Sequence, residues 1–408
     1  MAFTFTTDIS ASALDSFVIR SEQNSLFQCS PWEKVKSNWG FLRCGVTDNG
    51  EVCASALVLV RRMPLGKTLF YIPRGPVMDY GNKELVTCMF EGLRKLAKQR
   101  HAIAIRFDPA VLSRRYSYRE RDEEHERQNE DVISLLQSIG AKHKGYTIRI
   151  EESTQPRYNA EMDIVPDFEK HLEHKTMKCI RSALHKGIKV YEGPEYVHDF
   201  AEAMHYTEVR KQIALRDEQY FKTMLEAYGE RGICMVTKLN FPEQIGKLQE
   251  AVRSAEEELA GNVSKKKKAE LEQNLARDRK ELGLLEEDYK REGRDEVITC
   301  GILACWNENL MELFYMGNNP DYLRMYSSYL LYKLCLDRCV ELGIPKCSFG
   351  GIEGTLDDGL TLFKSNWIMN VEEYIGEFNI VLDPLMYTAF DKVYPEMLKF
   401  AAKMRGKQ

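Results

Sequence analysis

The sequence has no long hydrophobic run and no start of the basic-then-apolar kind. None of its apolar stretches approaches the roughly 20 residues that a membrane-spanning helix needs. Residues 1–10 also lack the pattern of a secretory signal peptide. These absences predict a cytoplasmic protein without a transmembrane segment.

The sequence also lacks the cysteine patterns of a metal site. It contains 11 cysteines, but none of them forms a C-x-x-C pair. Cys300/Cys305 and Cys335/Cys339 have neither the spacing nor the histidine partners of a zinc site. We therefore expect no metal, and in a cytoplasmic protein we expect the thiols to be free.

An excess of basic charge and the motifs of covalent catalysis are missing as well. The formal net charge is −5, which excludes a generally basic nucleic-acid coat but still allows a local basic patch. There is no Gly-x-Ser-x-Gly element and no clear Cys–His pairing, so a covalent nucleophile is not indicated. With 44% hydrophobic residues over 408 positions, the chain can form two or three folded domains.

Two parts of the chain share one order of predicted elements: hairpin strands, a long helix and a further strand. In the first part these are strands at 41–47, 52–62 and 67–71, a helix at 83–100 and a strand at 102–107. In the second part they are strands at 297–306 and 311–316, a helix at 326–343 and a strand at 346–349. This order resembles the core of GNAT-type N-acyltransferases and predicts an α/β fold with two GNAT-like domains.

Three features of the first part suggest departures from regular structure. Residues 72–76 hold two prolines around Arg74 and Gly75, so we expect this segment to leave the sheet. Residues 114–130 carry charges of both signs, which is typical of a solvated loop or helix face. Asp108 ends a strand, where a carboxylate suits catalysis or binding; a cap on the turn is an equally good interpretation.

Residues 243–292 differ from the rest of the chain because Glu, Lys, Arg, Leu and Ala dominate them. One apolar seam precedes Gly261-Asn262 and another follows it, and residues 265–268 are all lysine. The pattern predicts a projecting, antiparallel two-helix coiled-coil arm with a basic turn. Such an arm suits contact with tRNA or a partner protein, but it also fits a structural spacer.

The stretch from Ser348 to Trp367 is a candidate site. Gly350 and Gly351 follow an apolar strand and precede a helical pattern. A glycine-rich turn in this position can present backbone N–H groups to an anion or an oxyanion. Lys364, beside Phe363, can add a fixed positive charge. The alternative is an ordinary loop with a surface lysine.

Several motifs together resemble the FemABX family, the non-ribosomal peptidyltransferases that build the interpeptide bridges of bacterial peptidoglycan. The resemblance covers essentially the whole chain, and the inserted arm is similar to that of the FemA and MurM/MurN type. Its motifs are Ser30-Pro31-Trp32-x-x-Val35-Lys36, Arg61-Arg62-x-Pro64-Leu65, Tyr71-Ile72-Pro73-Arg74-Gly75-Pro76, Arg106-Phe107-Asp108-Pro109, Phe349-Gly350-Gly351-Ile352 and Phe363-Lys364-x-x-Trp367.

The resemblance implies a domain organisation. Residues 1–153 plus 376–408 would form a first GNAT-like domain, which binds the muropeptide carrier. Residues 154–242 plus 293–375 would form the second, and residues 243–292 the arm.

The resemblance also implies an activity. An amino acid (glycine, alanine or serine) would pass from aminoacyl-tRNA to the stem-peptide lysine amine, or to a bridge residue on it. The acceptor would be a lipid-linked or nucleotide-linked precursor, and peripheral contact with the inner membrane face is expected for the lipid-linked form. No cofactor is implied.

Site residues are implied in the same way. Lys364 would lie near the tRNA end and the developing oxyanion, and Asp108 near the acceptor amine, as the catalytic pair. Lys36 and Arg210 would meet the diphosphate of the carrier. The other expected substrate-binding residues are Tyr71, Arg74, Tyr220, Gly350, Gly351 and Phe363.

Two alternatives remain open. An acyl-CoA-dependent N-acyltransferase would have the same fold class, although the sequence shows no Arg/Gln-x-x-Gly-x-Gly/Ala pyrophosphate loop after a strand. A non-catalytic tRNA-binding or scaffold protein could instead be organised by the arm. Deletion of residues 243–292 separates these classes, because a scaffold would lose all function whereas a transferase should still act on small donors.

Overall fold

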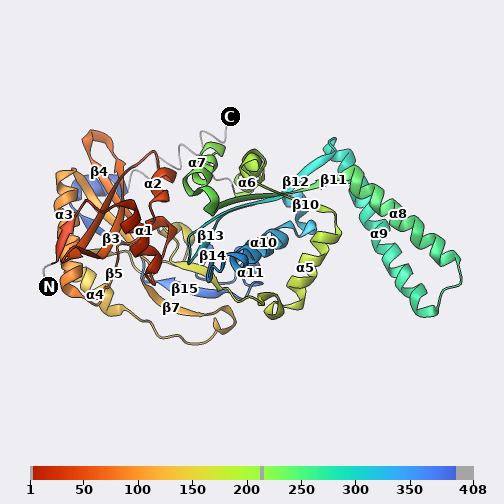
Figure 1. Ribbon diagram of the computed structural model, residues 1–408, viewed down its shortest axis with the longest axis horizontal. Helices are drawn as coiled ribbons and strands as arrows, with labels where there is room; N and C mark the ends of the chain where they lie inside the picture. The colour runs from red at the N-terminus through yellow and green to blue at the C-terminus, as the bar shows by residue number, and fades with distance from the viewer. Residues whose placement is uncertain (1–2, 212–215, 392–408) are drawn as a thin grey trace.

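The structure, a computed structural model, describes residues 3–211 and 216–391. Two sheets with their helices lie side by side along the long axis, and a pair of helices projects beyond the second sheet (Figure 1). Within the described ranges, no helix combines the length and apolar character needed to cross a membrane.

The first sheet is built mainly from the N-terminal part of the chain. Its order is β1-β2-β3-β4-β6-β16-β8, with β5 paired to β3. Helix α3 (Lys83–Gln99) is capped by Asn82 and buries Leu85, Met89 and Leu93 in the core of this unit. The strands are β1 (Thr4–Thr6), β2 (Gly40–Asp48), β3 (Glu51–Arg62), β4 (Thr68–Arg74), β5 (Val77–Met78), β6 (Ala102–Pro109), β8 (Lys142–His143) and β16 (Phe378–Val381). The other helices are α1 (Ala11–Arg20), α2 (Pro31–Val35) and α4 (Glu130–Ser138).

The second sheet has the order β10-β11-β12-β13-β14-β9-β15-β7. Buried residues of α10 pack with those of β12 and β14 in one core cluster. The strands are β7 (Leu112–Ser117), β9 (Tyr158–Asp163), β10 (Ile188–Glu192), β11 (Gly232–Asn240), β12 (Glu296–Trp306), β13 (Met311–Asn318), β14 (Lys346–Ile352) and β15 (Asn370–Tyr374). The helices are α5 (His174–His185), α6 (Val197–Lys211), α7 (Glu218–Tyr228), α10 (Ser327–Leu342) and α11 (Gly359–Lys364).

Each sheet contains an antiparallel hairpin followed by a helical crossover to a parallel strand. In the first sheet β4 connects through α3 to its parallel neighbour β6. In the second sheet β13 connects through α10 to its parallel neighbour β14. Parallel strands need such crossovers. The predicted α/β class with two GNAT-like units is confirmed.

Each sheet contains one strand from the part of the chain that mainly builds the other sheet. β16 lies between β6 and β8 in the first sheet, and β7 pairs with β15 at the edge of the second. β7 therefore lies in the second sheet although it falls inside the predicted first domain, 1–153. The charged run begins as a strand rather than as a loop, because Arg114 and Arg115 pair with Glu373 and Glu372 across the ladder. The remaining domain boundaries stay a prediction.

β4 extends to Arg74 and so includes the first three residues of the segment 72–76, which we expected to leave the sheet. Pro73 lies opposite Asp108 of β6. On the other side of β4 the side-chain amide of Gln28 fills a gap toward β3: it donates to the Pro73 carbonyl oxygen (2.5 Å) and accepts from the Leu57 N–H (2.9 Å). The N–H and C=O of a strand residue point to the same side. The ring nitrogen of Pro73, which has no hydrogen to donate, therefore faces Gln28, and among the described residues no backbone carbonyl of a neighbouring strand lacks a donor because of it.

Helices α8 (Phe241–Ala260) and α9 (Lys265–Glu292) form a helical hairpin that projects from the second sheet (Figure 1). At its base, Phe241 stacks on Tyr289 with ring centroids 5.7 Å apart and packs with buried Leu285. Farther out, the ion pair between Arg279 and Glu256 links the two helices. Residues 243–292 thus form a two-helix arm, and its contact with tRNA stays a prediction.

The two units also share a core. Leu57 and Leu59 of the first sheet belong to the same buried cluster as Phe221 and Val236 of the second unit. Trp32 stacks on Phe314 of β13 with ring centroids 5.4 Å apart. This packing holds α2 against the second unit and fixes the position of the cleft walls to which both units contribute.

Candidate active-site cleft

A cleft of about 1020 Å³ lies between the two units. It brings together residues that are far apart in the sequence, from α2, β4, α7, β14 and α11. Most of the predicted site residues line it: Lys36, Tyr71, Arg74, Tyr220, Gly350, Gly351, Phe363 and Lys364. Their individual roles stay predictions.

Lys36 lies among aromatic rings at the wall formed by α2 and α7. Its Nζ is 5.3 Å from the ring centroids of both Trp32 and Tyr220, and 3.5 Å from the Tyr220 hydroxyl oxygen. Burial, together with the charge of Arg216, lowers the pKa of Lys36 to about 8. A bound anion would favour the charged form of this lysine, so the wall suits a phosphate group.

Lys364 lies at the end of α11 and faces the two glycines of β14. Its Nζ donates to the carbonyl oxygens of Gly351 (2.8 Å) and Gly350 (3.2 Å). Gly350 has a φ of +76°, and a Cβ on Gly351 would lie 2.4 Å from Pro156. Both positions therefore require glycine, which allows the two carbonyl dipoles to hold the ammonium group in place.

The structure corrects the predicted role of the glycine backbone. Both glycines lie within β14 rather than in a turn after it. The Gly350 N–H donates to Ser348 Oγ (3.2 Å), and Gly351 is paired with Asn159 of β9. The pair presents carbonyl groups to Lys364, so the positive charge of the lysine is the group that can face an oxyanion.

Asp108 lies behind the cleft wall. Its Oδ2 accepts from the Tyr71 hydroxyl (2.8 Å), its Oδ1 accepts from the Arg74 N–H (2.7 Å), and 3% of the residue is exposed. Burial raises the pKa of Asp108 to about 7, although the Arg74 charge opposes the shift. Tyr71 and Arg74 line the cleft, whereas Asp108 positions them. Its direct catalytic role stays a prediction.

The segment around Arg74 gives the cleft a fixed cation. The Arg74 guanidinium lies 4.1 Å from the ring centroid of Tyr374 and donates to the Pro156 carbonyl oxygen (2.8 Å). The predicted partner cation Arg210 lies near the end of α6. Its side chain is outside the described residues, so its contact with the carrier stays a prediction.

Sequence reasoning missed Glu312, which lines the cleft from β13. It is a buried residue, and burial raises the pKa of its carboxyl group to about 7, against the nearby charges of Arg74 and Lys364. The alternation of residues along this strand does not distinguish Glu312 from any other strand residue. A charged residue between Met311 and Leu313, both of them apolar, was the signal that could have identified it.

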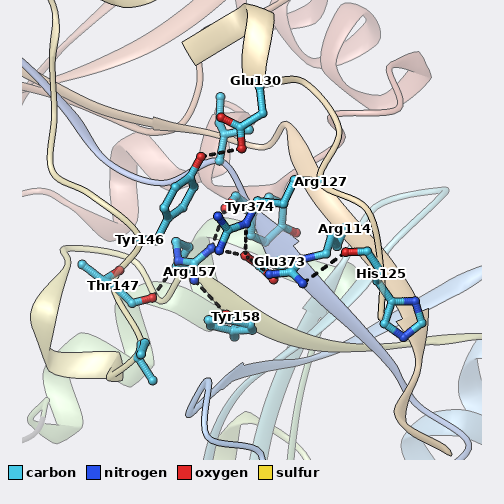
Figure 2. A network of polar contacts seen from close by, with 12 residues as sticks. Arg114, His125, Arg127, Glu130, Tyr146, Thr147, Arg157, Tyr158, Glu373 and Tyr374 are labelled. Atoms are coloured by element: carbon cyan, nitrogen blue, oxygen red, sulfur yellow. Dashed lines mark hydrogen bonds and ion pairs between the residues drawn. The ribbon is translucent and has the colours of Figure 1, made fainter. Parts of the chain in front are cut away.

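A cluster of arginines around Glu373 ties the elements beside the cleft together (Figure 2). The Glu373 carboxylate lies 2.5 Å from Arg157 Nη1, 2.8 Å from Arg114 Nε and 3.9 Å from Arg127 Nε. Arg157 also donates to the Thr147 carbonyl oxygen (2.6 Å). We call Glu373 with Arg114, Arg127 and Arg157 the arginine cluster. It joins β7 and β15 with the segment after β7, which holds Arg127, and with the loop from β8 to β9, which holds Arg157.

The profile of the FemAB family matches residues 9–394. The chain belongs to the FemAB family. The lipid II:glycine glycyltransferases of Staphylococcus aureus strains MRSA252 and USA300 are 27% and 28% identical to it over 423 residues, covering 96% of this chain and 96% of each relative. A crystal structure of FemX has a TM-score of 0.75 at 25% identity, covering 96% of this chain and 100% of FemX. The predicted family is confirmed, and the relatives are transferases, the enzyme class that the sequence predicts.

Proposed function

We propose that this FemAB-family chain is a cytoplasmic, non-ribosomal aminoacyltransferase of peptidoglycan synthesis. It moves glycine, alanine or serine from aminoacyl-tRNA to the stem-peptide lysine amine, or to a bridge residue on it. Similarity to the lipid II:glycine glycyltransferases supports glycine and a lipid-linked acceptor, reached by peripheral contact with the inner membrane face. The observation that carries the proposal is a single cleft lined by Lys36 from one unit and Lys364 from the other.

This transfer needs few protein groups. An aminoacyl ester is already activated, so the amine needs positioning, the loss of one proton and stabilisation of the oxyanion. Lys364, held by two carbonyl oxygens, faces the developing oxyanion in our proposal. The N–C bond forms, the ester C–O bond to the ribose breaks, and the ribose oxygen takes up a proton. The scheme includes no covalent enzyme intermediate.

The remaining residues bind and orient the substrates. Lys36, beside Tyr220, binds the diphosphate of the carrier, together with Arg210. Tyr71 and Arg74 hold the acceptor peptide and are themselves held by Asp108. Phe363, Gly350 and Gly351 shape the part of the cleft beside Lys364, where the aminoacyl end of the tRNA enters.

The test is transfer of radiolabel from charged tRNA onto stem-peptide precursors. Glycyl-, alanyl- and seryl-tRNA are each offered with lipid-linked and nucleotide-linked lysine pentapeptides. We expect transfer in at least one pairing, most readily from glycyl-tRNA to the lipid-linked precursor. Deletion of residues 243–292 is expected to weaken transfer from tRNA while some transfer from a small aminoacyl ester remains.

Two outcomes would contradict the proposal. The absence of transfer in every pairing, with acetyl-CoA turnover on an amine, would identify an acyl-CoA-dependent enzyme of the same fold. Binding of tRNA without turnover of either donor would identify a scaffold organised by the arm.

A further inference from the structure

A row of polar side chains crosses the second sheet beside the cleft. Glu312 of β13 is paired with Ser348 of β14, and Ser348 is paired with Glu161 of β9. Residues paired across neighbouring strands project from the same face, with Cβ atoms roughly 5 Å apart. Glu312, Ser348 and Glu161 therefore form one continuous row, which we call the polar row.

The polar row is buried in its middle and reaches different surroundings at its two ends. Its three residues are 9%, 4% and 7% exposed, in the order Glu312, Ser348, Glu161. Glu312 lines the cleft at one end. At the other end Glu161 Oε1 lies 3.0 Å from Lys346 Nζ and 3.6 Å from Arg115 Nη2, whose side chains are 43% and 32% exposed. The row thus leads from the cleft to solvent.

The charges around the row allow its carboxyl groups to exchange protons near neutral pH. Arg74, Lys364 and Glu372 face Glu312, which also accepts a hydrogen bond from Ser348, and burial raises its pKa to about 7. Glu372, Lys346 and Arg115 face Glu161, and burial with the Glu372 charge raises its pKa to about 8. A hydroxyl such as that of Ser348 can accept one proton while it donates another.

The second carboxylate on the cleft wall, that of Asp358, accepts hydrogen bonds from the first turn of α11. Among the described residues that line the cleft, the carboxyl groups belong to Glu312 and Asp358. Asp358 caps α11 by accepting from the N–H groups of Leu360 (2.8 Å) and Thr361 (3.2 Å), and these hydrogen bonds lower its pKa. Glu312 is the cleft carboxyl group that is connected to a buried polar row.

We infer that the polar row carries the proton released by aminolysis from the cleft to solvent. The inference rests on the proposed function. An acceptor amine enters as an ammonium group with three protons: the amide product keeps one, the ribose oxygen takes one, and one must leave. The Glu312 carboxylate takes that proton from the ammonium group before attack, Ser348 passes it on, and Glu161 releases it beside Lys346.

The test compares Glu312→Gln and Glu161→Gln with the control Glu308→Gln, an exposed glutamate on the same β12–β13 hairpin. In single-turnover transfer at pH 7 we expect losses of about 100-fold and about 10-fold, and an unchanged rate for the control. Both losses should shrink as the pH rises toward the pKa of the acceptor amine, because solvent hydroxide then removes the proton. Imidazole buffer should partly restore Glu161→Gln.

A purely structural role predicts a different pattern. Losses in both variants that do not change with pH or with imidazole would overturn the inference, as would wild-type rates in either one. If the wild-type protein transfers normally but the two variants do not show the expected losses, the proposed function stands and only the inference about the polar row is wrong.

A second measurement follows the protonation of Glu312 in the absence of a transfer reaction. Calorimetry in buffers of different ionisation enthalpy measures proton release when the nucleotide-linked precursor binds at pH 7. We expect release with the free lysine amine, because an ammonium group beside Glu312 favours its charged form. No such release is expected with the Nε-acetylated precursor or in Glu312→Gln. Proton release that is equal in all cases would overturn the inference, whereas a failure of the nucleotide-linked precursor to bind would count against that acceptor in the proposed function.

Discussion

The arginine cluster and the polar row are both buried groups of charged residues in the second sheet, but they differ in their supply of cations. In the cluster, one carboxylate lies within ion-pair distance of three arginines. In the row, two carboxyl groups lie on either side of a serine on paired strands. Partly exposed cations lie beside Glu161, and the cleft lysine and arginine lie near Glu312.

This difference separates a structural role from a chemical one. In the cluster, three guanidinium groups surround one carboxylate, and these ion pairs can hold β7, β15 and the loop before β9 together. Carboxyl groups that are buried with few cations have raised pKa values and can take up a proton near pH 7. The comparison therefore predicts opposite responses to the same Glu→Gln change.

The largest effect is expected for Glu373→Gln. It leaves Arg157, whose side chain is 2% exposed, without its carboxylate partner. Breaking a buried ion pair in this way costs about 3–5 kcal/mol of unfolding free energy. Urea denaturation measures it, with Glu308→Gln as the exposed control, expected within about 0.5 kcal/mol of wild type. A loss as small as that of the control would remove the structural role of the cluster.

Glu312→Gln should show the opposite sign and depend on pH. The folded-state pKa of Glu312 is raised from 4.5 to about 7, so the folded protein binds more protons than the unfolded chain between these values. Wild-type stability therefore falls as the pH rises through this window, by on the order of 3 kcal/mol from this group.

The glutamine variant lacks this dependence. Relative to wild type, its unfolding free energy should increase between pH 5 and pH 8, as followed by urea titrations at both values. A difference between variant and wild type that is the same at pH 5 and pH 8 would show that Glu312 has an ordinary pKa.

Tyr71→Phe tests the case between these two, because Asp108 has one phenol and one backbone N–H as partners. The variant should lose about 1 kcal/mol. It should also raise the pKa of Asp108 further, since the Tyr71 hydrogen bond favours the charged carboxylate. Thermal unfolding at pH 6 and pH 8 measures both effects. A more stable variant at pH 8 would contradict this account of Asp108.

Arg127→Ala should have the smallest effect. Its side chain is 40% exposed and lies 3.9 Å from Glu373, so it contributes as a partly solvated ion pair, worth up to about 1 kcal/mol. Denaturation at low and high salt measures this contribution, which should shrink with salt. A loss comparable to that of Glu373→Gln would mean that Arg127, rather than Arg157, holds the cluster together.

The sequence predicted what depends on local pattern. Alternation of apolar residues located β2 and β3 almost to the residue, and the apolar stripe of Leu85, Met89 and Leu93 located α3. The family motifs named Lys36 and Lys364, which the structure brings to one cleft.

The sequence did not predict what depends on distant partners. Pro73 stays in β4 because its carbonyl oxygen accepts from the side-chain amide of Gln28, 45 positions earlier, in place of a strand N–H. Arg114 lies in β7 because it pairs across the ladder with Glu373, which is 259 positions later in the sequence. The polar row depends on the pairing of β9 with β14, which no local pattern of Glu312 reveals.

The most direct test of the central claim, that this cleft is the transfer site, is the single-turnover rate of Lys364→Ala with charged tRNA and the lysine precursor. The matched control is Lys333→Ala, a lysine of α10 that is ion-paired with Glu169 and Asp337. We predict a loss of about 100-fold for Lys364→Ala with precursor affinity retained, since one oxyanion-stabilising group is removed. The control should transfer at the wild-type rate. Wild-type transfer by Lys364→Ala would contradict the claim.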